Sequence, residues 1–355
     1  MSSPHLRRAL TALYGEPAPA ASVVRLRGDA STRCYFRAHI EGAGPTLPSS
    51  LIVMQLPEDA FRSDEGGAEP SATRLPFLEV AELLQSRGLP VPAIYAEDLE
   101  HGIVLLEDLG DVTLYEELTR VPPENWPELY GRAVDLLAEL HARCEELPED
   151  SIVARRRFDR ALLDWELDHF REWGLEALFG ELEPNQAESL RRAFETIANR
   201  IETMPYGFVH RDYQSKNLMV RPDGDLALID FQDALLGPRV YDLVALLCDS
   251  YVPLDLALQE SMISRYAALR RIEPGLLHEE FWWVALHRKL KDAGRFIFID
   301  RVRKNPDFLR WFPQSLVYVG RAAERAGGLE SLNELLHTKI AGFPDAVARP
   351  ASLME

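Results

Sequence analysis

Residues 208–233 read FVHRDYQSKNLMVRPDGDLALIDFQD, and this stretch decides the interpretation of the fold. Two short apolar runs flank a turn at Pro222–Gly224, which predicts a β-hairpin. Asn217 and Asp230 are equally distant from the centre of this turn, so the two arms bring them side by side. Carboxylate and amide oxygens are ligands that magnesium prefers. The hairpin therefore predicts a magnesium site at its open end.

Asp212 lies five positions before Asn217, on the loop that enters the hairpin. A carboxylate there can accept a proton from a hydroxyl group while a metal ion neutralises a phosphate, as phosphoryl transfer requires. In the alternative interpretation, residues 210–212 form a turn with a buried salt bridge, and Asp230 merely ends a strand. We favour the catalytic interpretation, because the two acids and the asparagine occur together in one hairpin.

The chain around this stretch changes from strands to helices. Residues 23–26, 34–40, 51–56 and 94–106 are typical of strands, with one helix expected over 75–85. After about residue 110, helices are expected over 126–144, 158–179, 185–204, 255–270, 277–297 and 307–325, and the first 15 residues predict a short amphipathic helix.

The arrangement of residues 208–233 resembles the aminoglycoside phosphotransferase and choline kinase family, relatives of the protein kinases. The resemblance implies an α+β, protein-kinase-like bilobal fold. We expect a small antiparallel-sheet N-lobe on the phosphate side of the nucleotide (residues 1–106), a hinge (residues 107–112), and a larger helical C-lobe with the catalytic loop and the acceptor site (residues 113–355).

The same resemblance assigns roles to residues of the hairpin and its surroundings. Asp212 matches the catalytic base, and Asn217 and Asp230 match the residues that hold Mg²⁺. His210 and Asp242 match structural positions, with Asp242 bracing the catalytic loop from a later helix.

For ATP, the resemblance points to two N-terminal segments. The hinge sequence LLEDLG at 105–110 places Glu107 and Leu109 where backbone groups meet adenine. The other ATP-binding candidates form one loop and the residue after it: Gly28, Asp29, Ser31, Thr32 and Arg33. Met54 stands where most kinases carry a lysine that contacts the phosphates. We expect Arg33 or Arg37 to replace that lysine, the alternative being ordinary arginines on a strand surface.

Within the family, several stretches resemble bacterial kinases of the anomeric hydroxyl of N-acetylmuramate and N-acetylglucosamine: residues 28–37, 51–54, 158–163, 172–173, 230–234 and 288–294. The implied acceptor is an amino sugar, and the implied pathway is cell-wall recycling. Candidate acceptor residues are Asp233, Glu166, Arg288 and Lys291, the alternative being solvated helix charges. Four aromatic residues either stack on the sugar or belong to the core: Trp282, Trp283, Phe296 and Phe298.

The amino-acid composition restricts the kinds of partner and the compartment that we expect for the protein. The formal net charge is −18, so a nucleic-acid partner is not expected. No apolar run reaches the length of a membrane span, and three widely spaced cysteines favour a reducing cytoplasm. Two other functions stay open: a kinase for a cationic alcohol such as an aminoglycoside or choline, and a catalytically dead nucleotide-binding module.

Overall fold

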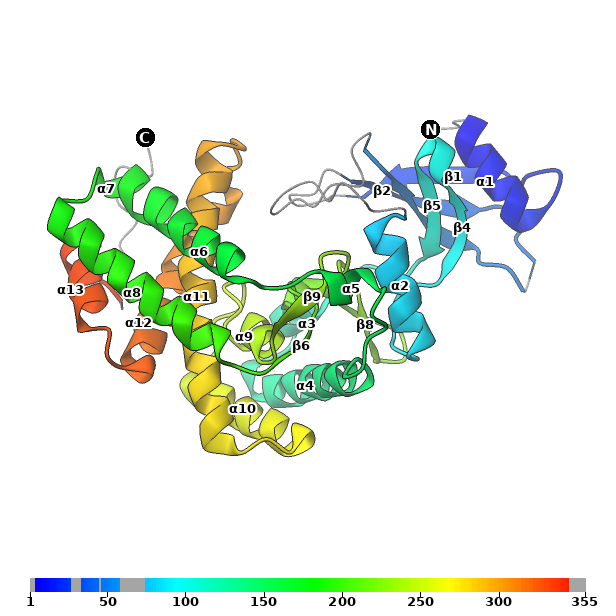
Figure 1. The fold of residues 1–355 in the computed structure, drawn as a ribbon. Coiled ribbons are helices and arrows are strands. Elements are labelled where there is room, and N and C mark those ends of the chain that lie inside the picture. The colour runs from blue at the N-terminus through cyan, green and yellow to red at the C-terminus, as the bar shows by residue number, and fades with distance from the viewer. Residues whose placement is uncertain (1–3, 27–32, 45, 58–73, 345–355) are drawn as a thin grey trace. The chain divides into compact units, whose positions relative to one another are not determined.

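The structure is a computed structural model that describes residues 4–26, 33–44, 46–57 and 74–344 (Figure 1). Packing divides the chain into two compact units. Unit 1 comprises residues 1–112 and 219–233, and unit 2 comprises residues 113–218 and 234–355. The loop residues Gly28, Asp29, Ser31 and Thr32, expected to bind ATP, lie outside the described residues.

Unit 1 is built on a five-stranded sheet in the order β1-β2-β3-β5-β4, in which all neighbours are antiparallel. The strands are β1 (Ala21–Arg25), β2 (Cys34–Ile40), β3 (Ser50–Gln55), β4 (Ile94–Asp98) and β5 (Ile103–Glu107). Their branched and aromatic side chains suit a pleated, half-buried surface, and the strand predictions are confirmed.

Helix α1 (Pro4–Tyr14) covers one face of this sheet. Its buried residues Leu6 and Leu10 are four positions apart and pack against a core that includes Ala38, Leu51 and Leu105. Helix α2 (Pro76–Ser86) and the short 3-10 helix η1 (Leu99–His101) complete the N-terminal elements.

The predicted hairpin is present as β7 (Leu218–Val220) and β8 (Leu226–Leu228), a two-stranded sheet. Gly224 adopts φ +90° in its turn, a conformation that favours glycine. The Val220 amide donates to the Val112 carbonyl at 2.7 Å, and the Leu228 amide to the Pro90 carbonyl at 2.7 Å. These bonds join the hairpin to the N-terminal residues of unit 1.

Unit 2 is mostly helical. Its helices are α3 (Leu114–Arg120), η2 (Pro123–Asn125), α4 (Trp126–Arg143), α5 (Ile152–Arg155), α6 (Arg160–His169), the π-helix η3 (Phe170–Glu176), α7 (Ala177–Phe179), α8 (Pro184–Glu202), η4 (Ser215–Asn217), α9 (Tyr241–Leu247), α10 (Leu256–Arg270), α11 (Pro274–Arg301), η5 (Pro306–Trp311), α12 (Phe312–Ala326) and α13 (Glu330–Lys339). Two short strands, β6 (Tyr206–Val209) and β9 (Leu235–Pro238), pair antiparallel. The α+β fold predicted from the sequence is confirmed.

Helix α11 forms the centre of unit 2 and packs against α6, α9, α12 and η3. It is buried on most of its faces, and Trp282, Trp283 and Phe296 belong to its core side chains. For these three aromatic residues the core interpretation is the right one. None of the helices in the described ranges combines the length and apolar character that crossing a membrane requires.

Candidate active site

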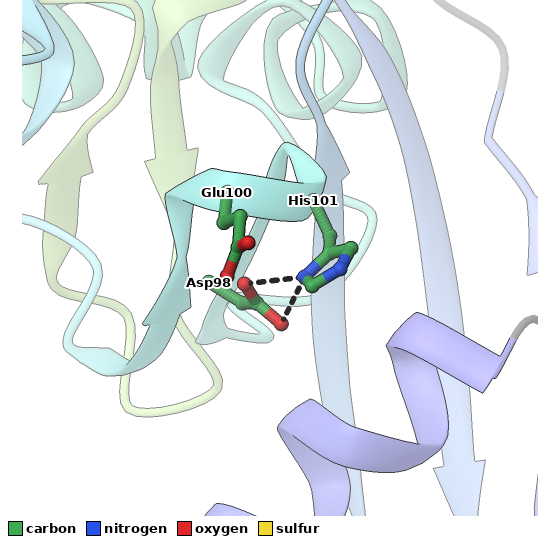
Figure 2. A group of neighbouring side chains, drawn as sticks. All are labelled: Asp98, Glu100 and His101. Carbon is green, nitrogen blue, oxygen red and sulfur yellow. Dashed lines mark hydrogen bonds and ion pairs between the residues drawn. The ribbon is translucent and has the colours of Figure 1, made fainter.

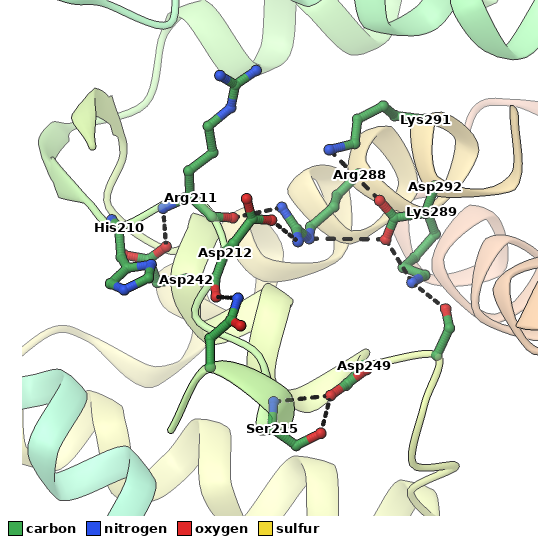
Figure 3. Close-up of polar contacts among 12 residues, drawn as sticks. His210, Arg211, Asp212, Ser215, Asp242, Asp249, Arg288, Lys289, Lys291 and Asp292 are labelled. Atoms are coloured by element: carbon green, nitrogen blue, oxygen red, sulfur yellow. Dashed lines mark hydrogen bonds and ion pairs between the residues drawn. The ribbon is translucent and has the colours of Figure 1, made fainter. Parts of the chain in front are cut away.

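The loop after β6 is held by a carboxylate from α9. Asp242 is fully buried, and its two oxygens accept the amides of His210 at 2.7 Å and Arg211 at 2.9 Å (Figure 3). Arg211 has φ +81°, which is rare for a residue with a side chain. Such a conformation costs on the order of 1–3 kcal/mol and persists only where the surroundings enforce it. Asp242 supplies part of that enforcement.

Asp242 is in turn fixed by helices distant in sequence. Nε2 of His141, on α4, lies 3.2 Å from Asp242 Oδ2, and Nδ1 of His141 lies 2.6 Å from the hydroxyl of Tyr266 on α10. All three side chains are buried. The loop thus rests on a polar chain that crosses three helices, and such networks hold their members in one arrangement.

Asp212 follows the strained residue, and its side chain is 34% exposed. Its Oδ1 lies 3.4 Å from Nη2 of Arg288, while Oδ2 has no hydrogen-bond donor within the described part of the chain. Its backbone carbonyl accepts the side-chain amide of Asn217 at 2.9 Å. The carboxylate is therefore held on one side and open on the other, as a general base requires.

Asn217 was predicted as a magnesium ligand, and its hydrogen bond bears on that role. The side-chain nitrogen is used by the Asp212 carbonyl, so Oδ1 is the atom turned to other partners. An amide oxygen is a suitable donor for magnesium. Two residues before it, Ser215 donates from its amide (3.0 Å) and its hydroxyl (2.5 Å) to the carboxylate of buried Asp249. Burial raises the pKa of Asp249.

Arg288 and Lys291 were predicted to hold an acceptor carboxylate, with solvated helix charges as the alternative. The structure excludes solvated charges, because both residues are buried, Arg288 at 1% exposure. Nη1 of Arg288 donates to the Arg211 carbonyl at 2.9 Å. Arg288 and Lys291, together with Lys289, surround Asp292 at 3.9, 3.7 and 2.8 Å. Burial alone raises the pKa of Asp292, but these three cations lower it below its usual range.

Glu166, another acceptor candidate, is completely buried on α6. Its Oε1 lies 3.4 Å from Nη2 of Arg211, and its Oε2 lies 3.6 Å from Nδ1 of His287. Burial lowers the pKa of His287, although Glu166 opposes this effect. The structure therefore brings Glu166 to the side chain of the strained loop residue.

Asp230, the other acid predicted for the active site, belongs to unit 1. Asp230 also has a positive φ, +65°, and its Oδ1 accepts Nε2 of Gln232 at 3.0 Å. The same nitrogen donates to Asp233 at 3.1 Å. Burial raises the pKa of Tyr35 to about 12, with Arg33 opposing and Asp230 adding to the effect. The charges of Arg33 and Asp230 therefore have opposite effects on the pKa of the Tyr35 hydroxyl.

Met54 is buried on β3 opposite Tyr35, so no lysine occupies that strand position. Arg37, one of the two expected replacements, is engaged elsewhere. Its guanidinium binds Asp108 through two bonds of 2.7 and 2.9 Å and donates to the Gly110 carbonyl at 3.0 Å. This arrangement fixes residues 108–110 of the predicted hinge segment (residues 107–112) and speaks against a phosphate-binding role for Arg37.

The predicted hinge residues contact the hairpin within unit 1. Glu107 Oε2 accepts the Ala93 amide at 3.1 Å and lies 3.6 Å from Nη2 of Arg221. Leu109 packs in an apolar cluster with Met219 and other hairpin residues. The pairs Arg37–Asp108 and Ser215–Asp249 were not predicted from the sequence. The only signal for either pair was an acid next to an apolar run.

Asp98, Glu100 and His101 form another polar cluster in unit 1 (Figure 2). The two oxygens of Asp98 lie 2.9 and 3.0 Å from Nδ1 of His101, and this contact lowers the pKa of Asp98. The ring of His101 also stacks on His5 of α1 at 4.1 Å. Through the ring of His101, this cluster helps to attach α1 to unit 1.

An antiparallel-sheet unit, a helical unit and a carboxylate on a braced loop define the class of kinase-like phosphotransferases. The sequence model of the phosphotransferase enzyme family matches residues 22–277, and the chain belongs to this family. It is therefore a nucleotide-using phosphotransferase of the kinase type.

Two similar proteins come from Pseudomonas, and both are named N-acetylmuramate/N-acetylglucosamine kinase. The Pseudomonas aeruginosa protein is 32% identical over 331 residues, which cover 91% of this chain and 90% of that protein. The Pseudomonas putida protein is 30% identical over 337 residues, or 93% and 91%.

Solved structures share the fold. The choline kinase LicA from Streptococcus pneumoniae superposes with a TM-score of 0.58 at 19% identity, over 91% of this chain and 99% of that one. Its complex with AMP superposes equally well, with a TM-score of 0.58 at 17% identity over 90% and 98% of the two chains.

Proposed function

We propose that this chain transfers the γ-phosphoryl group of ATP to the anomeric hydroxyl of N-acetylmuramate or N-acetylglucosamine. The observation that carries the proposal is the carboxylate of Asp212, of which one oxygen contacts Arg288. It is partly exposed, whereas the other charged groups of its cluster are buried. The names of the two Pseudomonas relatives support the amino-sugar acceptor.

In the proposed reaction, Asp212 accepts the proton as the sugar O–H bond breaks. The hydroxyl oxygen bonds to the γ-phosphorus, and the bond from that phosphorus to the bridging oxygen breaks, which leaves ADP. Asn217 and Asp230 would supply oxygen ligands for Mg²⁺, which would neutralise phosphate charge when bound. The hard-oxygen chemistry of both side chains supports this assignment.

For ATP, we propose that the hinge backbone at Glu107 and Leu109 meets the adenine and that Arg33 replaces the strand lysine. The contacts of Arg37 with the hinge support this choice between the two arginines. Gly28, Asp29, Ser31 and Thr32 are proposed to bind ATP, as the family resemblance implies.

For the acceptor, Asp233 and Lys291 are proposed to contact the sugar. Glu166 and Arg288 are buried against the loop residues 211 and 212, and we propose that they act through the loop. His210 and Asp242 are proposed as structural residues.

The proposed setting is cell-wall recycling in the cytoplasm, without a nucleic-acid or membrane partner. Three free cysteines support a reducing compartment. The net charge of −18 supports the exclusion of nucleic acid.

The test is ADP release by the purified chain with N-acetylmuramate, N-acetylglucosamine, kanamycin and choline. We expect turnover with the amino sugars and a phosphorylated product that hydrolyses in mild acid, because a glycosyl phosphate is acid-labile and an alkyl phosphate is not. A product that survives the acid, or a preference for kanamycin or choline, contradicts the proposed acceptor. Absence of turnover with all four indicates a nucleotide-binding module.

A further inference from the structure

We propose that Arg288 is a positioning residue for phosphoryl transfer, which holds the Arg211 carbonyl and one carboxylate oxygen of Asp212. The inference rests on the proposed role of Asp212 as the base. It replaces the expectation that Arg288 binds a carboxylate of the acceptor.

The guanidinium of Arg288 is directed at the loop and is almost completely buried. Nη1 donates to the carbonyl of Arg211 at 2.9 Å, and Nη2 lies 3.4 Å from Oδ1 of Asp212 (Figure 3). Its face lies over the ring of Tyr241, 4.9 Å from the centroid. Two donors of one rigid, planar group thus meet two consecutive loop residues.

Arg288 completes the restraint that Asp242 begins. Asp242 accepts the amide of Arg211, and Arg288 donates to the carbonyl of the same residue. Arg211 is the residue with φ +81°, so its two peptide groups are held in an unfavourable backbone conformation by α9 and α11. The backbone direction at Asp212 therefore depends on both helices.

The contact also orients the carboxylate of Asp212. Because Nη2 of Arg288 holds Oδ1, rotation of the side chain is restricted and Oδ2 is the oxygen presented for proton transfer. Within the described residues no donor contacts Oδ2, and the side chain is 34% exposed. A small displacement of such a base from its productive position reduces turnover strongly.

Arg288 is itself fixed by its helix. Asp292, one turn later on α11, lies 3.9 Å from Nε of Arg288 and 2.8 Å from Nζ of Lys289. Lysine in place of Arg288 would keep the positive charge, but a single ammonium group cannot reproduce the fork between the carbonyl and the carboxylate. Arg288→Lys is therefore the variant that separates position from charge.

The test compares kcat and KM for Arg288→Lys and Arg288→Gln in the parent and in the Asp212→Asn background. In the parent, we expect Arg288→Lys to lower kcat by about 10²-fold, with both KM values little changed and the thermal midpoint retained. In the Asp212→Asn background, the same change is expected to alter the residual rate by less than about threefold, because residues that act through one group are not additive.

Arg265→Lys is the matched control, since Arg265 also binds a carboxylate, that of Asp135, at 2.7 and 2.6 Å on the surface. We expect it to keep the parent kcat. A parent-like kcat for Arg288→Lys, or an equal loss in both backgrounds, would overturn the proposal. If Arg288→Gln does not fold, the lysine variant alone decides.

Failure of the proposed function gives different results. A parent that phosphorylates neither amino sugar disproves the acceptor, and the variants are then compared by ATP hydrolysis, in which water replaces the sugar hydroxyl. If the single variant Asp212→Asn turns over at the rate of the parent, the role of Asp212 as the general base is disproved.

Discussion

Two arginine–aspartate pairs, Arg37–Asp108 in unit 1 and Arg288–Asp212 in unit 2, use the same construction for different ends. Each arginine binds the carboxylate and also donates to a nearby backbone carbonyl, at 3.0 Å for Gly110 and 2.9 Å for Arg211. The difference lies in the other partners of the two carboxylates.

Both oxygens of Asp108 are satisfied. Oδ1 accepts from Arg37 and from the Gly110 amide at 3.0 Å, and Oδ2 accepts from Arg37 and from the Ser50 hydroxyl at 2.5 Å. Among the residues that the structure describes, the carboxylate of Asp212 has a single long contact, to Arg288. A carboxylate with all its acceptor sites occupied stabilises the fold, whereas one with an open oxygen is able to take up a proton. Four predictions sharpen or break this comparison.

The largest effect is expected when each aspartate is replaced by asparagine. Asp212→Asn should lower kcat by roughly 10²–10⁴-fold, the usual contribution of a general base, without a large loss of stability. Asp108→Asn should keep most of the turnover of the folded enzyme. Steady-state kinetics of both variants check this, and a larger kcat loss in Asp108→Asn would reverse the assigned roles.

The second largest effect is expected when the carboxylate that supports the loop before Asp212 is removed. Asp242→Ala leaves the buried amides of His210 and Arg211 without acceptors, so we expect a loss on the order of 3 kcal/mol in the free energy of unfolding. Urea denaturation measures this loss. A variant as stable as the parent would show that the loop does not depend on α9.

A smaller effect is expected from breaking the pair in unit 1. Arg37→Gln removes charged hydrogen bonds from a partly buried site and should cost roughly 2 kcal/mol in the free energy of unfolding. The exposed pair Arg265–Asp135 provides the control, because Arg265→Gln should cost less than about 1 kcal/mol. Equal losses in the two variants would mean that burial of the first pair is unimportant.

The smallest effect concerns pH. Burial alone raises the pKa of Asp108, but hydrogen bonds from Arg37 and Ser50 bring it below the usual value. Because the unfolded chain then binds more protons, this stabilisation is complete above the unfolded pKa of about 4 and is lost as the pH falls through the folded pKa. The difference in unfolding free energy between parent and Asp108→Asn should therefore shrink below about pH 4. A difference that is constant with pH would contradict the ionised pair.

Much of the fold could be predicted because it depends on local pattern. Aromatic and apolar residues in 34–40 and 51–56, helical spacing in 75–85, and the turn at Pro222–Gly224 each specify an element without reference to the rest of the chain. The same applies to the part of the family resemblance that carries Asp212, Asn217 and Asp230, because these residues lie within one hairpin and its entrance. The proposed roles of Asp212, Asn217 and Asp230 stay predictions that the experiments above test.

The environment of each charge could not be predicted. Spacing of three places Arg288 and Lys291 on one face of a helix, but it does not tell whether that face meets water. The face proved buried because α11 is surrounded by other helices of unit 2. The role expected for both residues therefore depended on a neighbour that their own segment does not reveal.

By itself, the sequence determined the elements, the hairpin and the candidate catalytic residues, because each depends on residues close together in the chain. Tertiary structure alone decided which charges are paired: Arg37 with Asp108 and Arg288 with Asp212, partners 71 and 76 positions apart. Whether a carboxylate is saturated or open depends on donors that only folding brings to it. The spacing of residues along the chain does not tell which donors come within hydrogen-bond distance of a carboxylate.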